Sequence, residues 1–167
     1  KFKGTDLPPE IAILTYYSLI ILSSDAKSVK QSLAVCYYVL SKNPGYLPPD
    51  VDLLSAISSV LLIHLSDSSV VRRSSVLIHS LIDDKKGLID NSIAQLLLKS
   101  AYGFISDSQT LSIALMSLSS FINSSKLFGS QLSSTENIQI LHKIINDNKD
   151  EARIVSQSLV ILRAIVL

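Results

Sequence analysis

An aspartate recurs along the chain at a nearly constant spacing, each time shortly after an apolar segment. The four positions are Asp25, Asp67, Asp107 and Asp147, separated by 42, 40 and 40 residues. A carboxylate between two helices can accept hydrogen bonds from the free backbone amides that begin the second helix, and it suits the positive end of that helix dipole. The spacing therefore predicts four equivalent helix-starting turns, whose chemistry is capping and ion pairing.

A cation follows three of these four aspartates by five or six residues. The cations are Lys30, Arg72 and Arg153. A guanidinium group can hold two carbonyl or carboxylate acceptors at once. After Asp107 the corresponding position holds Ser112 in place of a cation.

Residues typical of catalysis or metal binding do not form a recognisable pattern. His64, His79 and His142 lack metal-ligand spacing, and the sequence contains neither a glycine-rich phosphate loop nor a Gly-x-Ser-x-Gly elbow. His64 and His79 fall on the two helices of one unit, and we expect them to be structural. Cys36 has apolar neighbours, which predicts a buried thiol. We therefore expect no enzyme activity, no cofactor and no metal.

Composition narrows the classes of partner. The 167 residues are 47% hydrophobic with a formal net charge of +1, which gives no long-range field to attract nucleic acid. The longest apolar stretches, 11–22 and 51–65, fall short of the roughly 20 residues that span a bilayer. The single cysteine excludes an internal disulfide. We expect no membrane span and an intracellular location, cytoplasmic or nuclear.

Alignment of the four aspartates divides the whole chain into repeats, each of which holds two apolar helices joined at the aspartate. The predicted repeats are 7–46, 47–88, 89–133 and 134–167. The predicted helix pairs are 8–23/26–42, 48–65/68–83, 89–105/108–123 and 136–146/149–166. The chain opens without a methionine and ends in "SLVILRAIVL" without a helix stop, so we expect 1–167 to be one α-solenoid fragment of a longer array.

This pattern resembles the HEAT repeat of the armadillo-like α-solenoid superfamily. The resemblance rests on an aspartate that ends the turn, then an apolar residue and a basic residue early in the second helix. The matching triplets are Asp25, Val29 and Lys30; Asp67, Val71 and Arg72; and Asp147, Ala152 and Arg153. The third unit departs from the pattern at Ser112. In HEAT arrays the aspartates and cations of successive turns stack into a ladder of ion pairs, so the resemblance implies that Asp67 contacts either Arg72 or a cation of the adjoining unit. It also implies a weak rung at Ser112. The resemblance implies an all-α, right-handed α–α superhelix of about four HEAT-like hairpins, with the second helices lining the concave side.

HEAT arrays typically act as protein–protein interaction scaffolds, so the resemblance implies a peptide or helix bound in the concave groove within a larger protein or complex. The polar candidates for that groove are Lys27, Gln31, Arg73, Ser112, Lys149 and Gln157. Arg73 follows Arg72 by one residue and is expected to face solvent or a ligand.

The tyrosines gather in the first unit as the doublets Tyr16–Tyr17 and Tyr37–Tyr38. Adjacent helical residues point about 100° apart, so one ring of each pair should be exposed, and we name Tyr17 and Tyr38 as candidates. These rings either cover an adjoining repeat or form a docking hot spot.

Two other roles remain open from the sequence. A nucleic-acid-associated HEAT scaffold would need one basic stripe, made of Lys27, Lys30, Arg73, Lys149 and Arg153. The trunk segment of a vesicle-coat adaptor is also compatible with the pattern. Near-neutral net charge disfavours the first of these alternatives.

Overall fold

The computed structural model describes residues 8, 10–42, 52–84, 92–124 and 132–166, and within these ranges it contains eight α-helices and no strand. This confirms the expected all-α class. The helices are α1 (Glu10–Ile21), α2 (Ala26–Lys42), α3 (Leu53–Ile63), α4 (Ser68–Asp84), α5 (Ser92–Gly103), α6 (Ser108–Ser124), α8 (Thr135–Asp147) and α9 (Ala152–Val166).

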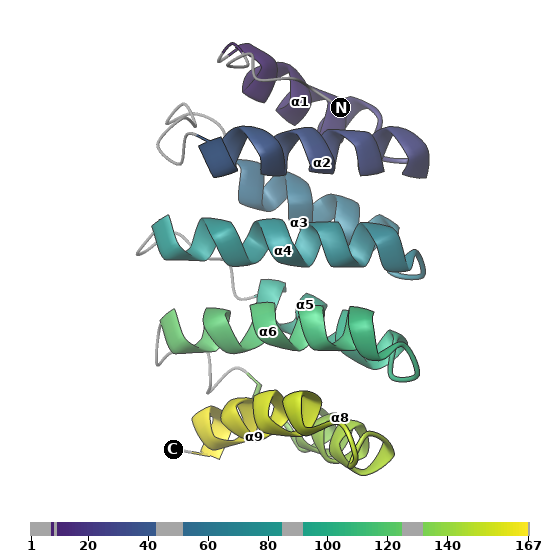
Figure 1. Cartoon of the computed structure of the whole chain (residues 1–167), viewed down its shortest axis with the longest axis vertical. Coiled ribbons are helices and arrows are strands. Elements are labelled where there is room, and N and C mark those ends of the chain that lie inside the picture. The colour runs from purple at the N-terminus through teal and green to yellow at the C-terminus, as the bar shows by residue number, and fades with distance from the viewer. Residues whose placement is uncertain (1–7, 9, 43–51, 85–91, 125–131, 167) are drawn as a thin grey trace.

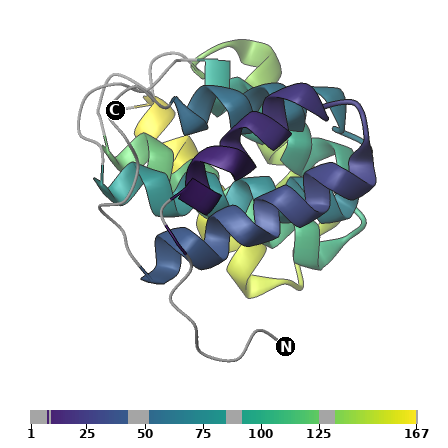
Figure 2. The ribbon, with the colours of Figure 1, turned by 90° about the horizontal axis from the view of Figure 1, so that it is seen from above.

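The helices form four hairpins that stack in two layers (Figures 1 and 2). The first layer consists of α1, α3, α5 and α8, and each of these helices contacts the next in that order. The second layer consists of α2, α4, α6 and α9 and packs more extensively along its length. The main apolar core runs through the stack between the layers.

Helical periodicity explains how each second-layer helix joins this core. In α6, Leu111, Leu115, Leu118 and Ile122 recur at intervals of three or four residues, and all four are buried. That spacing places them along one face of a helix. Successive hairpins therefore bury continuous apolar stripes against one another.

The turn inside each hairpin has the same backbone geometry. Three turn residues follow the first helix, and the amide of the next residue donates to the carbonyl at the start of the turn: Asp25 to Leu22, Asp67 to His64, Asp107 to Phe104, and Glu151 to Asn148. The donor–acceptor distances are 3.0, 2.9, 2.9 and 2.9 Å. We call Asp25, Asp67, Asp107 and Glu151 the cap positions.

The fourth cap position corrects the sequence alignment. Asp147 was aligned with the other three aspartates, but it is the last residue of α8 and does not precede α9. Helix α8 continues to Asp147, so the turn comes later, and Glu151 is the residue directly before α9. The acidic character of the position is kept, and the predicted start of the last helix at 149 is three residues early.

The other predicted helix bounds that fall on described residues agree with the observed bounds to within two residues. The predicted helix starts at 48 and 89, and the predicted repeat boundaries at 7, 46–47 and 88–89, lie outside the described residues. The repeat boundary at 133–134 falls just before α8, whose cap Ser134 accepts the amide of Asn137.

Small side chains allow the second-layer helices to approach one another. Seven residues after each cap position the side chain is small and buried: Ser32, Ser74, Ala114 and Ser158. One residue further along α4, the carbonyl of Ser75 accepts a bond of 2.7 Å from the Ser117 hydroxyl of α6. Ser75 and Ser117 are thus packing residues between α4 and α6.

Among the described residues, no helix combines the length and apolarity needed to cross a membrane.

Candidate functional site

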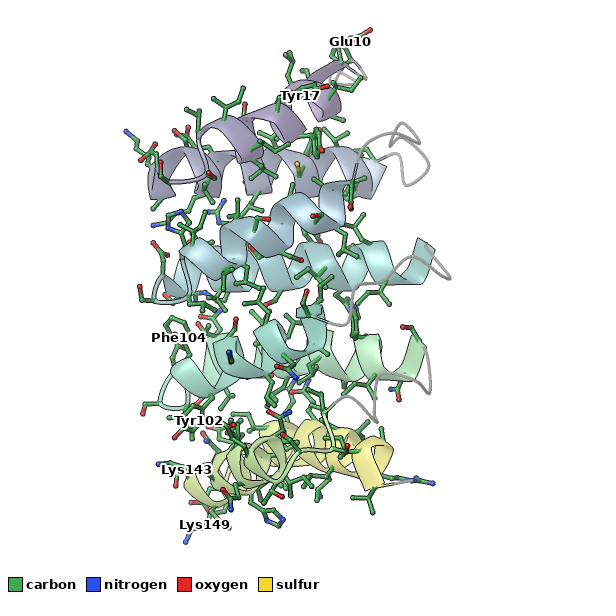
Figure 3. The ribbon with its side chains drawn as sticks, turned by 180° about the vertical axis from the view of Figure 1, so that it is seen from behind. Glu10, Tyr17, Tyr102, Phe104, Lys143 and Lys149 are labelled. Atoms are coloured by element: carbon green, nitrogen blue, oxygen red, sulfur yellow. The ribbon has the colours of Figure 1, made fainter. Side chains whose placement is uncertain are left out.

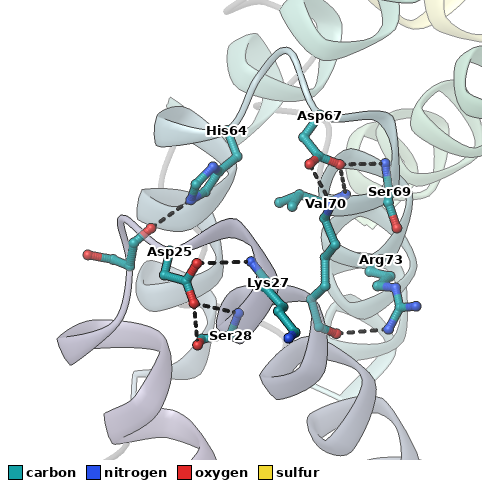
Figure 4. Close-up of polar contacts among 10 residues, drawn as sticks. Asp25, Lys27, Ser28, His64, Asp67, Ser69, Val70 and Arg73 are labelled. Atoms are coloured by element: carbon teal, nitrogen blue, oxygen red, sulfur yellow. Dashed lines mark hydrogen bonds and ion pairs between the residues drawn. The ribbon is translucent and has the colours of Figure 1, made fainter.

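The cap aspartate of the second hairpin binds both its own helix and the preceding one. Asp67 Oδ1 accepts the backbone amides of Ser69 and Val70, and Asp67 Oδ2 lies 2.7 Å from Lys30 Nζ on α2 (Figure 4). The hydrogen bond from Lys30 holds the pKa of Asp67 below its ordinary value. Asp67 therefore pairs with a cation of the adjoining hairpin and not with Arg72.

Arg72 also contacts the hairpin that follows its own, as Lys30 does. It stands five residues after Asp67, as Lys30 stands five after Asp25, and its Nη1 donates to Gln109 Oε1 at 2.6 Å beside the next cap position. The pKa of Asp107 is lowered first by the hydroxyl of Thr110, with a smaller contribution from the positive charge of Arg72. Lys30 and Arg72 thus each reach toward the cap region of the following hairpin.

The third junction carries a neutral contact in place of an ion pair among the described residues. The Ser112 hydroxyl, five residues after Asp107, lies 3.4 Å from Gln157 Oε1 on α9. Arg153 lies near the sulfur of Met116, with 3.7 Å from Nη2 to Sδ, and not beside an aspartate. The weak rung predicted at Ser112 therefore corresponds to a long contact between two polar side chains.

A second cross-hairpin contact was missed by the sequence reasoning. His64 Nε2 lies 2.7 Å from the carbonyl oxygen of Ser23, and Asn148 Nδ2 donates to the carbonyl of Ile105 at 3.3 Å. His64 and Asn148 occupy the same turn position, three residues before the cap. Because a carbonyl only accepts, Nε2 of His64 must carry a proton. His64 thus bonds to the preceding hairpin; the sequence signal was a polar residue at this position in two turns.

The predicted polar candidates separate into exposed and buried groups. Lys27, Gln31 and Arg73 are exposed on α2 and α4, and Lys149 is exposed in the last turn. Ser112 is buried and Gln157 is half-buried, and these two side chains contact each other. We therefore correct the sequence prediction by removing Ser112 from the candidate surface. The polar surface that remains belongs mainly to the first two hairpins.

The tyrosine doublets place one ring outward each, as expected. Tyr17 is 51% exposed while Tyr16 packs against the core, and the two rings meet edge to face with centroids 5.3 Å apart. On α2, Tyr37 is 47% exposed and Tyr38 is half-buried. The sequence prediction had chosen Tyr38, and the exposed ring of that pair is Tyr37.

A pocket of about 270 Å³ opens on the second layer between α2 and α4. Its lining residues are Leu33, Ala34, Tyr37, Arg72, Arg73 and Val76. Arg73 Nη1 donates to the carbonyl of Lys30 at 2.8 Å, which holds its guanidinium against α2. This bond uses one of the five N–H groups of a guanidinium. The pocket therefore combines apolar walls, an exposed aromatic ring and a fixed cation.

The cysteine has no role at this surface. Cys36 is 3% exposed, and burial raises the pKa of its thiol to about 12. The thiol therefore stays protonated and unreactive near neutral pH, as expected of a structural residue.

Comparison with known proteins provides no relative for this chain: no family model, no curated protein and no solved structure matches it.

Proposed function

We propose that this chain is a non-catalytic scaffold of the HEAT-like helical-repeat type and that it binds a segment of a partner protein on its second layer. The hairpins would follow the right-handed superhelix implied by the resemblance, with the second layer on its concave side. The recurrent cap geometry supports a repeat architecture, since equivalent residues make equivalent contacts at successive junctions.

The pocket between α2 and α4 carries the functional part of the proposal. Tyr and Arg are the residue types most enriched where partners dock, and here Tyr37 and Arg73 line the same recess. The apolar walls suit an aliphatic or aromatic side chain, and the guanidinium suits a neighbouring carboxylate or carbonyl group. A peptide with an apolar side chain next to an acidic one fits this chemistry.

A nucleic-acid scaffold is less well supported by the charges. Two of the cations in the predicted basic stripe are engaged within the chain: Lys30 by Asp67, and Arg73 by the Lys30 carbonyl. Acidic cap residues alternate with the cations along the same end of the second-layer helices. A phosphate backbone gains affinity from uncompensated Lys and Arg contacts, so this alternation works against it.

The experiment begins with affinity capture of partners on the chain and continues with one purified partner. Binding is measured to wild type, to an Arg73→Glu/Tyr37→Ser variant and to Lys99→Glu, which reverses an exposed cation on the first layer. We expect about a tenfold or greater loss for the double variant alone, because a desolvated anchor and a cation are removed together. Equal affinities for all three proteins would show that the partner does not bind at the second-layer pocket.

A further inference from the structure

A strip of large apolar side chains lies exposed on the first layer, whose helices face the viewer in Figure 3, where Tyr102 is labelled. The strip consists of Ile20, Ile21, Leu62, Ile63 and Tyr102, at the ends of α1, α3 and α5. These residues stand four and five positions before the cap of their hairpins. In α8 the same two positions hold Asn146 and Asp147, which end the strip.

The strip residues are exposed because of the position that they occupy in each hairpin. The two positions are exposed in all four hairpins, including α3 and α5, which have neighbouring hairpins on both sides. An adjoining repeat that stacks on either end of the array would therefore not cover them. Leu62 is 62% and Ile63 53% exposed in the second hairpin. Large apolar side chains that are exposed at the same position of three successive hairpins favour a site of interaction.

A groove of about 400 Å³ between α3 and α5 adjoins the strip at Leu62. It opens because α3 has small side chains, Ser58 and Ser59, where α1 carries Tyr16 and Tyr17. The hydroxyls of Ser58 and Ser59 donate to the carbonyls of Leu54 and Ser55. Their oxygen lone pairs remain as acceptors on the groove wall.

Two lysines lie near the apolar strip. Lys99 lines the groove and is exposed, and Lys143 Nζ lies 5.9 Å from the ring centroid of Tyr102. Asp52, which also lines the groove, lies at the far end of α3 and accepts the amide of Ser55 as its helix cap. The apolar strip is therefore bordered by two lysines.

We propose that this groove and strip bind an amphipathic helix from a partner protein, with apolar side chains against Leu62, Ile63 and Tyr102 and a carboxylate facing Lys99 and Lys143. A groove with small serine side chains on its wall lets a helix backbone approach closely. The apolar face of such a helix would cover the exposed side chains of the strip. The surface is separate from the second-layer pocket, so this inference does not depend on the proposed function. Anionic lipid is disfavoured because cap aspartates lie in the turns beside the strip.

The test is selection from a display library of random helix-length peptides on the immobilised wild-type chain, followed by anisotropy titration of an enriched peptide. We expect enriched peptides to combine an apolar helical stripe with acidic residues. Leu62→Asp and Lys99→Glu should each weaken binding about tenfold, whereas Arg163→Glu, at an exposed cation in the last turn of α9, should leave it unchanged. Selection on the Lys99→Glu chain should shift the enriched charge from acidic to basic.

Three outcomes would overturn the inference. The first is that enriched peptides bind Leu62→Asp and Lys99→Glu as tightly as wild type, with helicity and melting unchanged. The second is concentration-dependent self-association in sedimentation that Leu62→Asp abolishes, which would assign the strip to a second copy of the chain. The third is binding to anionic phospholipid vesicles that Leu62→Asp abolishes, which would assign it to a membrane surface.

Discussion

Asp67 joins two tasks in one side chain, since one oxygen caps its own helix and the other pairs with Lys30 of the preceding hairpin. The pKa of this carboxyl is lowered in the folded protein, first by the hydrogen bond from Lys30. A lowered folded-state pKa means that ionised Asp67 stabilises the fold. That contribution is fully present above the ordinary value of 3.8 and is lost as pH falls through the folded-state pKa.

We predict that Asp67→Ala lowers the free energy of unfolding by about 1–2 kcal/mol at neutral pH, because both the cap and the pair are removed. Lys30→Ala should cost less, about 0.5 kcal/mol, since the cap survives and the pair is partly exposed. Urea melts from neutral pH down to acid pH measure both effects. The difference between wild type and Asp67→Ala should shrink below pH 3.8; a constant difference would show that ionisation of Asp67 is irrelevant.

The two adjacent arginines should differ in stability. Arg72 is half-buried and donates to Gln109 of the next hairpin, whereas exposed Arg73 donates to a backbone carbonyl. We predict that Arg72→Ala destabilises the chain by about 1 kcal/mol and Arg73→Ala by less than half of that. Urea denaturation of the two variants at one pH tests this. A larger loss for Arg73→Ala would reverse the assigned roles.

At the scale of the helices, the sequence predicted those features that follow directly from local hydrogen bonding. Three of four cap positions were found, because an aspartate before a helix satisfies free amides wherever it occurs. The fourth was placed at Asp147 because the spacing was held at 40 residues while the true turn comes later, at Glu151. Spacing alone cannot detect one extra helical turn.

The candidate surface was harder to predict than the helices. Ser112 and Gln157 looked available in sequence, but they contact each other across α6 and α9. The groove between α3 and α5 depends on which helices become neighbours. Ser58 and Ser59 are recognisable as groove residues only in the folded chain, where Lys99 lines the same groove. Such pairings between hairpins are set by tertiary packing and leave no local signal.

The small buried position on the second layer gives a matched pair of variants. Ser74 is fully buried and its hydroxyl has no hydrogen-bond partner among the described residues, while the equivalent residue of α6 is Ala114. We predict that Ser74→Ala is neutral or stabilising by up to about 1 kcal/mol, because an unpaired buried hydroxyl is removed. Ser74→Leu should destabilise by about 1–3 kcal/mol, since a much larger side chain would have to fit at a fully buried position. Thermal melts that rank the two variants in the opposite order would contradict close packing at this position.

In the part of the chain that the structure describes, the molecule is a stack in which the extensive helix contacts lie within one hairpin or between adjacent hairpins. Its stability then approximates a sum of hairpin and junction contributions. The contacts between α4 and α6 are the most extensive in the stack, and α1 and α9 each lack a hairpin on one side within the described chain (Figure 1).

We predict that amide hydrogen exchange is slowest in α4 and α6 and faster in α1 and α9, because end hairpins open at lower free energy than central ones. Native-state exchange followed by mass spectrometry measures this gradient. Uniform protection along the chain would indicate one cooperative unit and would contradict additive stacking.

The central claim is that the second layer, at the pocket between α2 and α4, receives a partner protein. The most direct measurement is the same hydrogen-exchange experiment on the chain with and without a purified, captured partner. We predict added protection in α2 and α4 around Tyr37 and Arg73, and loss of that protection in the Arg73→Glu/Tyr37→Ser variant. Protection confined to the first layer, or an unchanged pattern in a saturated complex, would contradict it.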